Sequence, residues 1–254
     1  MDDSFVFMLK PYTLECVYVS DSIAGVLGQP RSLGHNITEL LVEGEADFVI
    51  RTLRTAVGGN KAAIILYLQF LDGQNGNYIP CQMAFSVAGN VIIGSVSLAS
   101  LDTIGTTVRD QSAEEIIIAS TELTSHPGVV GRPANNWTRT RLPRTALLLD
   151  RFTLNCDIIY CSNNMILSET CVGARGGFFK YVVERDLDSV RSFLRNLKQS
   201  GLKVDSPTNV GFVYHTFSLC VAGRDFVALS GEIRVSAVGI ASSDGLILVL
   251  KREP

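Results

Sequence analysis

An internal repeat is the feature that most constrains the fold of this chain. The first half carries an aromatic-Thr-Leu-x-Cys element at Tyr12 to Cys16, followed by an apolar stretch that ends at Ser20-Asp21. The second half carries the same element at Phe152 to Cys156, and its apolar stretch ends at Ser162-Asn163. The same element at the same place in both halves favours duplication over coincidence. A duplicated chain of 254 residues is expected to fold as two small domains.

The segments after this element also correspond in the two halves. Each half contains one stretch with apolar residues at the spacing of an amphipathic helix. These residues are Val49, Leu53 and Ala56 in the first half and Val190, Phe193, Leu194 and Leu197 in the second. Each half then has three β-type segments separated by turn residues. They span 62–71, 78–87 and 91–99, then 211–221, 226–237 and 246–251. The predicted fold class is α+β, with two tandem domains that each form a five-stranded antiparallel sheet with helices on one face.

A polar region rich in glycine, proline and asparagine separates the two repeats, and such a composition is typical of a linker. We therefore expect a first domain over residues 1–101, a linker over 102–144 and a second domain over 145–254. The linker contains several arginines, which could dock an acidic partner or could simply be solvated. Those arginines are Arg132, Arg139, Arg141 and Arg144.

The order of these elements resembles the PAS family. The strands that end in Tyr18-Val19-Ser20-Asp21 and Tyr160-Cys161-Ser162-Asn163 are similar to the second strand of that family. The stretches at 25–28 and 34–41 are similar to the turns that follow it, and Gly173 and residues 184–188 occupy the matching places in the second half. The resemblance implies a sensory or protein-interaction module. Residues 146–153 further resemble PAS domains of fungal signalling and transcription proteins of the white-collar type.

Charge and hydropathy limit the partners of the chain. The net charge is −3, whereas proteins that wrap nucleic acid through phosphate contacts usually carry a basic excess. The longest apolar run, at 62–68, is much shorter than the roughly 20 residues of a membrane-spanning helix. The acidic N-terminus lacks the cationic region of a signal peptide. We expect a protein of the cytoplasm or nucleus that binds neither nucleic acid nor membranes.

The residues needed for PAS cofactors and for catalysis are missing from the expected places. The flavin-binding cysteine of blue-light sensors has no counterpart at 34–40 or 173–179, because Cys171 lies before the matching stretch. Haem needs an axial ligand, commonly a histidine. His215 lies in a segment where apolar and polar residues alternate, so we expect it on the sheet surface and not as a haem ligand. The chain has three histidines, and none lies near a nucleophile-elbow sequence. We expect no catalytic residues, no metal site and no cofactor.

The strands are apolar on both of their alternating faces. Ile92 and Ile93 point to opposite faces of one strand, as do Ile247 and Leu248 in the last strand. The helices pack on one face of the sheet. The other face would then expose an apolar patch of the kind that marks interaction sites. We name Ile92, Ile93, Ile247 and Val249 as the candidate interaction face. We expect this face to be covered by the other domain, by the linker or by a second chain.

Two functions remain open at this point. The first is a non-catalytic module for dimerisation or docking of a protein partner in signalling or transcriptional regulation. The alternative is a sensor that holds a small apolar ligand between sheet and helices. A cavity is expected in the first half, where smaller side chains such as Ile37, Leu40 and Leu53 occupy matching positions. The second half carries larger rings that could fill its interior, namely Phe178, Phe179, Phe193, Phe212 and Phe217.

Overall fold

The computed structural model describes residues 4–30, 33–99, 143–200, 212–226 and 231–253. Within these ranges the chain forms two five-stranded antiparallel sheets, with strand orders β2-β1-β5-β4-β3 and β7-β6-β10-β9-β8. The two orders are identical when the second half is counted from its own first strand. The α+β architecture expected from the repeat is therefore confirmed. Most of the expected linker lies outside the described residues.

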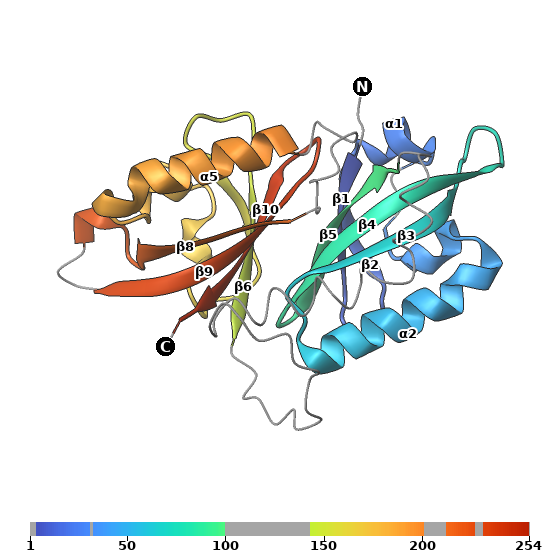
Figure 1. Cartoon of the computed structure of the whole chain (residues 1–254), viewed down its shortest axis with the longest axis horizontal. Helices are drawn as coiled ribbons and strands as arrows, with labels where there is room; N and C mark the ends of the chain where they lie inside the picture. The colour runs from blue at the N-terminus through green and yellow to red at the C-terminus, as the bar shows by residue number, and fades with distance from the viewer. Residues whose placement is uncertain (1–3, 31–32, 100–142, 201–211, 227–230, 254) are drawn as a thin grey trace, which may run out of the picture.

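The first domain runs from β1 to β5, and its long helix α2 lies across one face of the sheet (Figure 1). Its elements are β1 (Ser4–Leu9), β2 (Cys16–Val19), α1 (Ile23–Leu27), η1 (Ile37–Leu40), α2 (Glu43–Gly59), β3 (Ile64–Leu71), β4 (Tyr78–Ala88) and β5 (Val91–Leu98). The acidic first turn of α2, with Glu43 and Glu45, complements the positive end of the helix dipole. Asn60 ends this helix in the left-handed conformation.

The second domain repeats this plan, with α5 lying over its sheet on the side away from the first domain (Figure 1). Its elements are β6 (Arg144–Leu149), β7 (Ile158–Cys161), η2 (Glu169–Cys171), η3 (Phe178–Lys180), η4 (Glu184–Asp186), α5 (Leu187–Ser200), β8 (Val213–Cys220), η5 (Arg224–Phe226), β9 (Glu232–Ala241) and β10 (Leu246–Arg252). Arg144, placed in the linker by the sequence, is the first residue of β6 and pairs with Lys251.

One expected strand is displaced. The prediction of a strand over 226–237 is wrong at both ends, because Phe226 ends a 3-10 turn and β9 spans Glu232–Ala241. The strand starts after Gly231, whose φ of 67° favours glycine, and it continues until Ala241 pairs with Leu246 across the hairpin.

The same hydrogen bonds recur in both domains and support the duplication. The hydroxyl of Ser20 accepts from the backbone N–H of Val6 at 2.8 Å, and that of Ser162 accepts from Ala146 at 2.9 Å. At the opposite edge of each sheet a carboxylate accepts from a backbone N–H of the edge strand. Glu45 accepts from Gln69 in the first domain, and Asp186 accepts from Ser218 in the second, both at 2.7 Å.

The aromatic-Thr-Leu-x-Cys elements of the two domains nevertheless do not occupy equivalent positions residue by residue. Leu14 and Cys156 are the residues that share a positive φ, 60° and 49°, two positions before the second strand of each domain. Leu14 is buried, whereas Leu154 is 95% exposed. The longer turn after β6 therefore places a cysteine where the first domain has a leucine.

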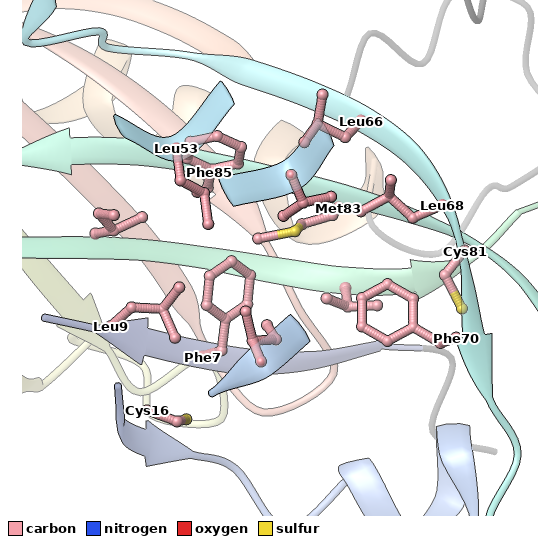
Figure 2. Close-up of a cluster of buried hydrophobic side chains, with 14 of the residues drawn as sticks. Phe7, Leu9, Cys16, Leu53, Leu66, Leu68, Phe70, Cys81, Met83 and Phe85 are labelled. Atoms are coloured by element: carbon pink, nitrogen blue, oxygen red, sulfur yellow. The ribbon is translucent and has the colours of Figure 1, made fainter. Parts of the chain in front are cut away.

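The first domain combines the smaller side chains that suggested a cavity with several large buried rings. Four phenylalanines of this core are fully buried, namely Phe5, Phe7, Phe70 and Phe85. Figure 2 shows the last three of them. Gly94 allows close packing here, since a Cβ at this position would lie 2.3 Å from the Ala84 carbonyl oxygen and 2.7 Å from both Phe7 Cζ and Phe85 Cβ.

The second domain distributes the same volume differently. By strand register, Leu248 replaces Gly94, Leu147 replaces Phe7 and Gly239 replaces Phe85. A Cβ on Gly239 would lie 2.8 Å from Leu197 and 3.2 Å from the Phe193 ring, so in this domain α5 supplies side chains where the strand supplies a ring in the first. The two cores thus place large and small residues at different matching positions.

Candidate functional site: the interface between the two sheets

The two sheets face each other with their helix-free sides, and their strands form the centre of the molecule (Figure 1). A third buried cluster, which we call the inter-sheet cluster, draws its side chains from both domains. Its fully or largely buried members are Val6, Met8, Ile65, Ala84, Ala88, Val91, Ile93, Ala146, Leu148, Ile240, Ile247 and Val249. Each domain therefore covers the apolar outer face of the other.

Strand alternation decides which of the candidate residues belong to this cluster. Ile93, Ile247 and Val249 lie in it, and all three are at most 2% exposed. Ile92 lies in the core of the first domain instead, so its assignment to the interaction face is wrong. The reason is that successive side chains of β5 point to opposite faces of the sheet. Leu248 likewise points into the second core.

Tyrosines border the cluster at equivalent places. Tyr18 pairs with Met8 in the first domain, and Tyr160 pairs with Leu148 in the second. Both tyrosines pack against the inter-sheet cluster together with Tyr67 and Phe212. Burial raises the pKa of Tyr67 and Tyr160, so these phenols stay neutral at physiological pH.

Polar contacts flank the cluster at two places. At the first, Ser4 at the start of β1 meets the turn after β9. The Ser4 N–H donates to Ser243 Oγ at 3.2 Å, and the Ser243 N–H donates back to Ser4 Oγ at 2.9 Å. Beside them Ser22 donates to the carboxylate of Asp244 at 2.6 Å. These bonds join residues from the two ends of the chain.

At the second place, Arg144 at the start of β6 meets the end of β4 and the residue that follows α2. Its guanidinium donates to the carbonyl oxygens of Asn60 and Val87. Burial lowers the pKa of Arg144 to about 10, which still leaves it charged at physiological pH. The amide nitrogen of Asn163 lies 3.5 Å from where a Cβ on Gly89 would be, an ordinary contact distance, and glycine is favoured there by its φ of 63°.

These two places involve corresponding residues of the two domains. Ser4 and Arg144 are equivalent residues, since each begins the first strand of its domain, and each contacts the far end of the fourth strand or its hairpin in the other domain. A contact in which equivalent patches meet each other is the arrangement of an isologous dimer. The chain thus builds within itself the kind of interface that a homodimer forms between subunits.

His215 does not lie on the sheet surface as the sequence suggested. Its ring is half-buried on the helix side of β8 and stacks with Phe193 at 5.3 Å and Phe217 at 6.0 Å between centroids. Burial lowers the pKa of His215, and the neighbouring Arg234 acts in the same direction, while Asp186 opposes them.

A serine approaches this histidine, and sequence spacing gave no sign of it. Ser189 Oγ lies 3.3 Å from His215 Nε2. The hydroxyl of Ser189 donates to the Asp186 carbonyl at 2.8 Å, so its proton is directed away from the imidazole.

In the described ranges, no group of three or more histidine, cysteine or acidic side chains is arranged to hold a metal ion. The helices described within those ranges are too short or too polar to cross a bilayer.

Comparison with solved structures gives PAS domains, whereas no protein-family model and no curated protein matches the sequence. The PAS domain of the Cronobacter turicensis RpfR quorum-sensing receptor, solved with BDSF, matches 39% of this chain and 97% of its own, at 11% identity and a TM-score of 0.35. The N-terminal domain of a Marinobacter aquaeolei diguanylate cyclase with a PAS/PAC sensor matches 37% of this chain and 94% of its own, at 12% identity and a TM-score of 0.33. The Drosophila melanogaster Cycle PAS-B domain with ethylene glycol matches 37% of this chain and 98% of its own, at 13% identity and a TM-score of 0.33.

Proposed function

We propose that this chain is a non-catalytic PAS-type interaction module whose two domains form an internal dimer and present the remaining surface to a protein partner. The observation that carries the proposal is the inter-sheet cluster, in which the outer face of each sheet is buried by the other. Self-association through these faces would require the two domains to separate. The likeness of residues 146–153 to fungal regulators supports a role in signalling or transcriptional control, in the cytoplasm or nucleus.

The surface left free by the internal dimer carries apolar side chains suited to a protein partner. The turn between β6 and β7 exposes Phe152 and Leu154, and the equivalent turn of the first domain exposes Tyr12. Val17 and Ile159 are the extra residues of matching β-bulges in the edge strands, and both are exposed. Bulges of this kind blunt an edge strand against unwanted pairing and re-aim its side chains.

A ligand sensor is the competing function, and it would need room for a ligand between the sheet and α2. Phenylalanine rings and Met83 belong to the core in this region, so a ligand there would contact them (Figure 2). BDSF was found with the RpfR domain and ethylene glycol with the Cycle domain, and neither ligand is attributed to this chain.

Native mass spectrometry of the full chain separates these functions. The proposal expects the mass of a single chain without a bound small molecule. A stoichiometric apolar ligand would favour the sensor instead. A stable dimer that is lost when Val249 is replaced by a polar residue, and kept when exposed Ile159 is replaced, would show that the sheet faces pair between chains and would contradict the internal dimer.

A further inference from the structure

The turn between β3 and β4 carries an asparagine followed by a glycine, a pair that the function proposed above does not use. Asn75-Gly76 is the one pair of this kind in the sequence. The turn projects from the end of the hairpin (Figure 1), and both residues are exposed. Asparagine is a chemically labile residue, and a following glycine has no Cβ to keep its backbone nitrogen away from the asparagine side chain. Asn75 is therefore the asparagine of this chain whose side-chain amide is most open to attack by the next backbone nitrogen.

Asp72 holds both reacting groups of this pair. Asn75 Nδ2 donates to Asp72 Oδ2 at 2.7 Å, and the Gly76 N–H donates to the Asp72 carbonyl oxygen at 2.8 Å. The other carboxylate oxygen of Asp72 accepts from the Gln74 N–H at 2.8 Å. The bonds from Gln74 and Asn75 lower the pKa of Asp72, so this carboxylate is charged at neutral pH. The Gly76 nitrogen has to leave its hydrogen bond before it can attack.

The same turn packs on the end of α1. The Gly73 N–H donates to the Leu27 carbonyl oxygen at 2.8 Å. Gln74 lies close against Gly28, since a Cβ on Gly28 would be 2.5 Å from Gln74 Cγ. At its other end α1 follows Ser22, which donates to a carboxylate of the second domain. A change in the turn therefore acts on an element that also takes part in the contact between the domains.

We propose that Asn75 is a site of non-enzymatic deamidation whose rate is held down by Asp72 and whose product loosens the turn from α1. The Gly76 nitrogen attacks the side-chain carbonyl carbon of Asn75 and gives up its proton. The bond from that carbon to the side-chain nitrogen breaks, and ammonia leaves. The cyclic imide then takes up one water and opens to aspartate or isoaspartate. Water is the one co-reactant, and nothing is oxidised or reduced.

The product places two like charges together in the turn. The amide that donates to Asp72 becomes a carboxylate, which has no proton to donate at neutral pH. Two carboxylates at the spacing of the present hydrogen bond repel each other. Because Asp72 also binds the backbone N–H groups of Gln74 and Gly76, its displacement acts on the part of the turn that contacts α1.

The first test incubates the intact chain in mildly alkaline buffer and follows each asparagine by peptide mass spectrometry. We expect aspartate and isoaspartate at position 75, whereas Asn77 and Asn90, which are exposed but precede larger residues, keep their amides. Asn75→Gln should abolish the reaction in this peptide. Asp72→Ala should speed it by about two- to tenfold, the effect of losing one hydrogen bond. An Asn75 that keeps its amide, equal rates at Asn77, or no acceleration in Asp72→Ala would overturn the proposal.

The second test measures amide hydrogen exchange in Asn75→Asp, which carries the charge of the product. Exchange of the Gly73 N–H should become about two- to tenfold faster, because its hydrogen bond to α1 opens more often. Asn90→Asp adds the same charge to the exposed turn between β4 and β5, and it should leave exchange at Gly73 unchanged. If Asn75→Asp does not alter this exchange, or Asn90→Asp alters it equally, the effect on α1 is refuted.

Discussion

A disulfide placed across the two domains would test whether they pack as an internal dimer. Ser4 Oγ and Ser243 Oγ lie 3.3 Å apart although the residues are 239 positions apart in the chain. Ser4→Cys with Ser243→Cys should therefore close a bond after mild oxidation. The six native cysteines are buried, which limits their competition for either new thiol.

The size of the effect follows from the length of the closed loop. For a loop of this length the chain-entropy relation gives a stabilisation of ~5.5 kcal/mol at 25 °C, and strain usually reduces it. We expect an oxidised double variant that is more stable than its reduced form by about 2 to 5 kcal/mol. The assay is urea unfolding followed by circular dichroism, with and without reductant. Each single variant is the control, and neither should respond to reductant beyond the wild type.

If the two cysteines fail to pair in the folded chain while both react with a small alkylating reagent, then Ser4 and Ser243 do not meet in solution. A bond that forms but lowers stability would mean that the domains must be distorted to bring these residues together.

The remaining predictions address the cluster, the core and the histidine. Ile93→Ala and Val249→Ala should each lower the free energy of unfolding by about 2 to 4 kcal/mol. Because both residues lie in the inter-sheet cluster, the effect of the double variant should differ from the sum of the single effects by at least ~0.5 kcal/mol. Ile92→Ala should cost a similar amount but combine additively with Val249→Ala in the same urea titrations, and equal coupling for both pairs would contradict the assignment of faces. Gly94→Ala should cost about 1 to 3 kcal/mol by overpacking against the Ala84 carbonyl and Phe7, and an unchanged melting temperature would show that these neighbours give way. The pKa of His215 is lowered by folding, so the unfolded chain takes up the proton first, and stability should fall as pH drops below about 6.5. His215→Gln should flatten this part of the stability–pH curve, and an identical slope would assign it to other groups.

Much of the fold could be predicted because it depends on local patterns. Apolar spacing located α2 and α5, since Val49, Leu53 and the matching residues of α5 must face a core once the helix forms. Turn residues and alternation located most strands. The failure at 226–237 also has a local cause: Phe226 is apolar, but it belongs to a turn that a strand pattern does not distinguish.

The filling of the cores and the position of His215 depended on tertiary structure. Counting large side chains suggested space in the first domain, yet Phe7 and Phe85 share the place vacated by Gly94, and only strand register brings these three residues together. His215 alternates like a surface residue, but α5 supplies Phe193 to cover it. Contacts between distant segments are not encoded in the spacing of either segment.

The sequence by itself determined that this chain is a duplicated α+β protein and that its strands are apolar on both faces, because repeats and alternation are local properties. Which isoleucine serves which face followed only from the sheet, where Ile93 joins Val249 and Ile92 joins the core. That the covering surface is the other half of the same chain was decided by tertiary structure alone. The physical reason is that hydrophobic burial is non-directional, so an apolar face requires a partner without specifying which surface provides it.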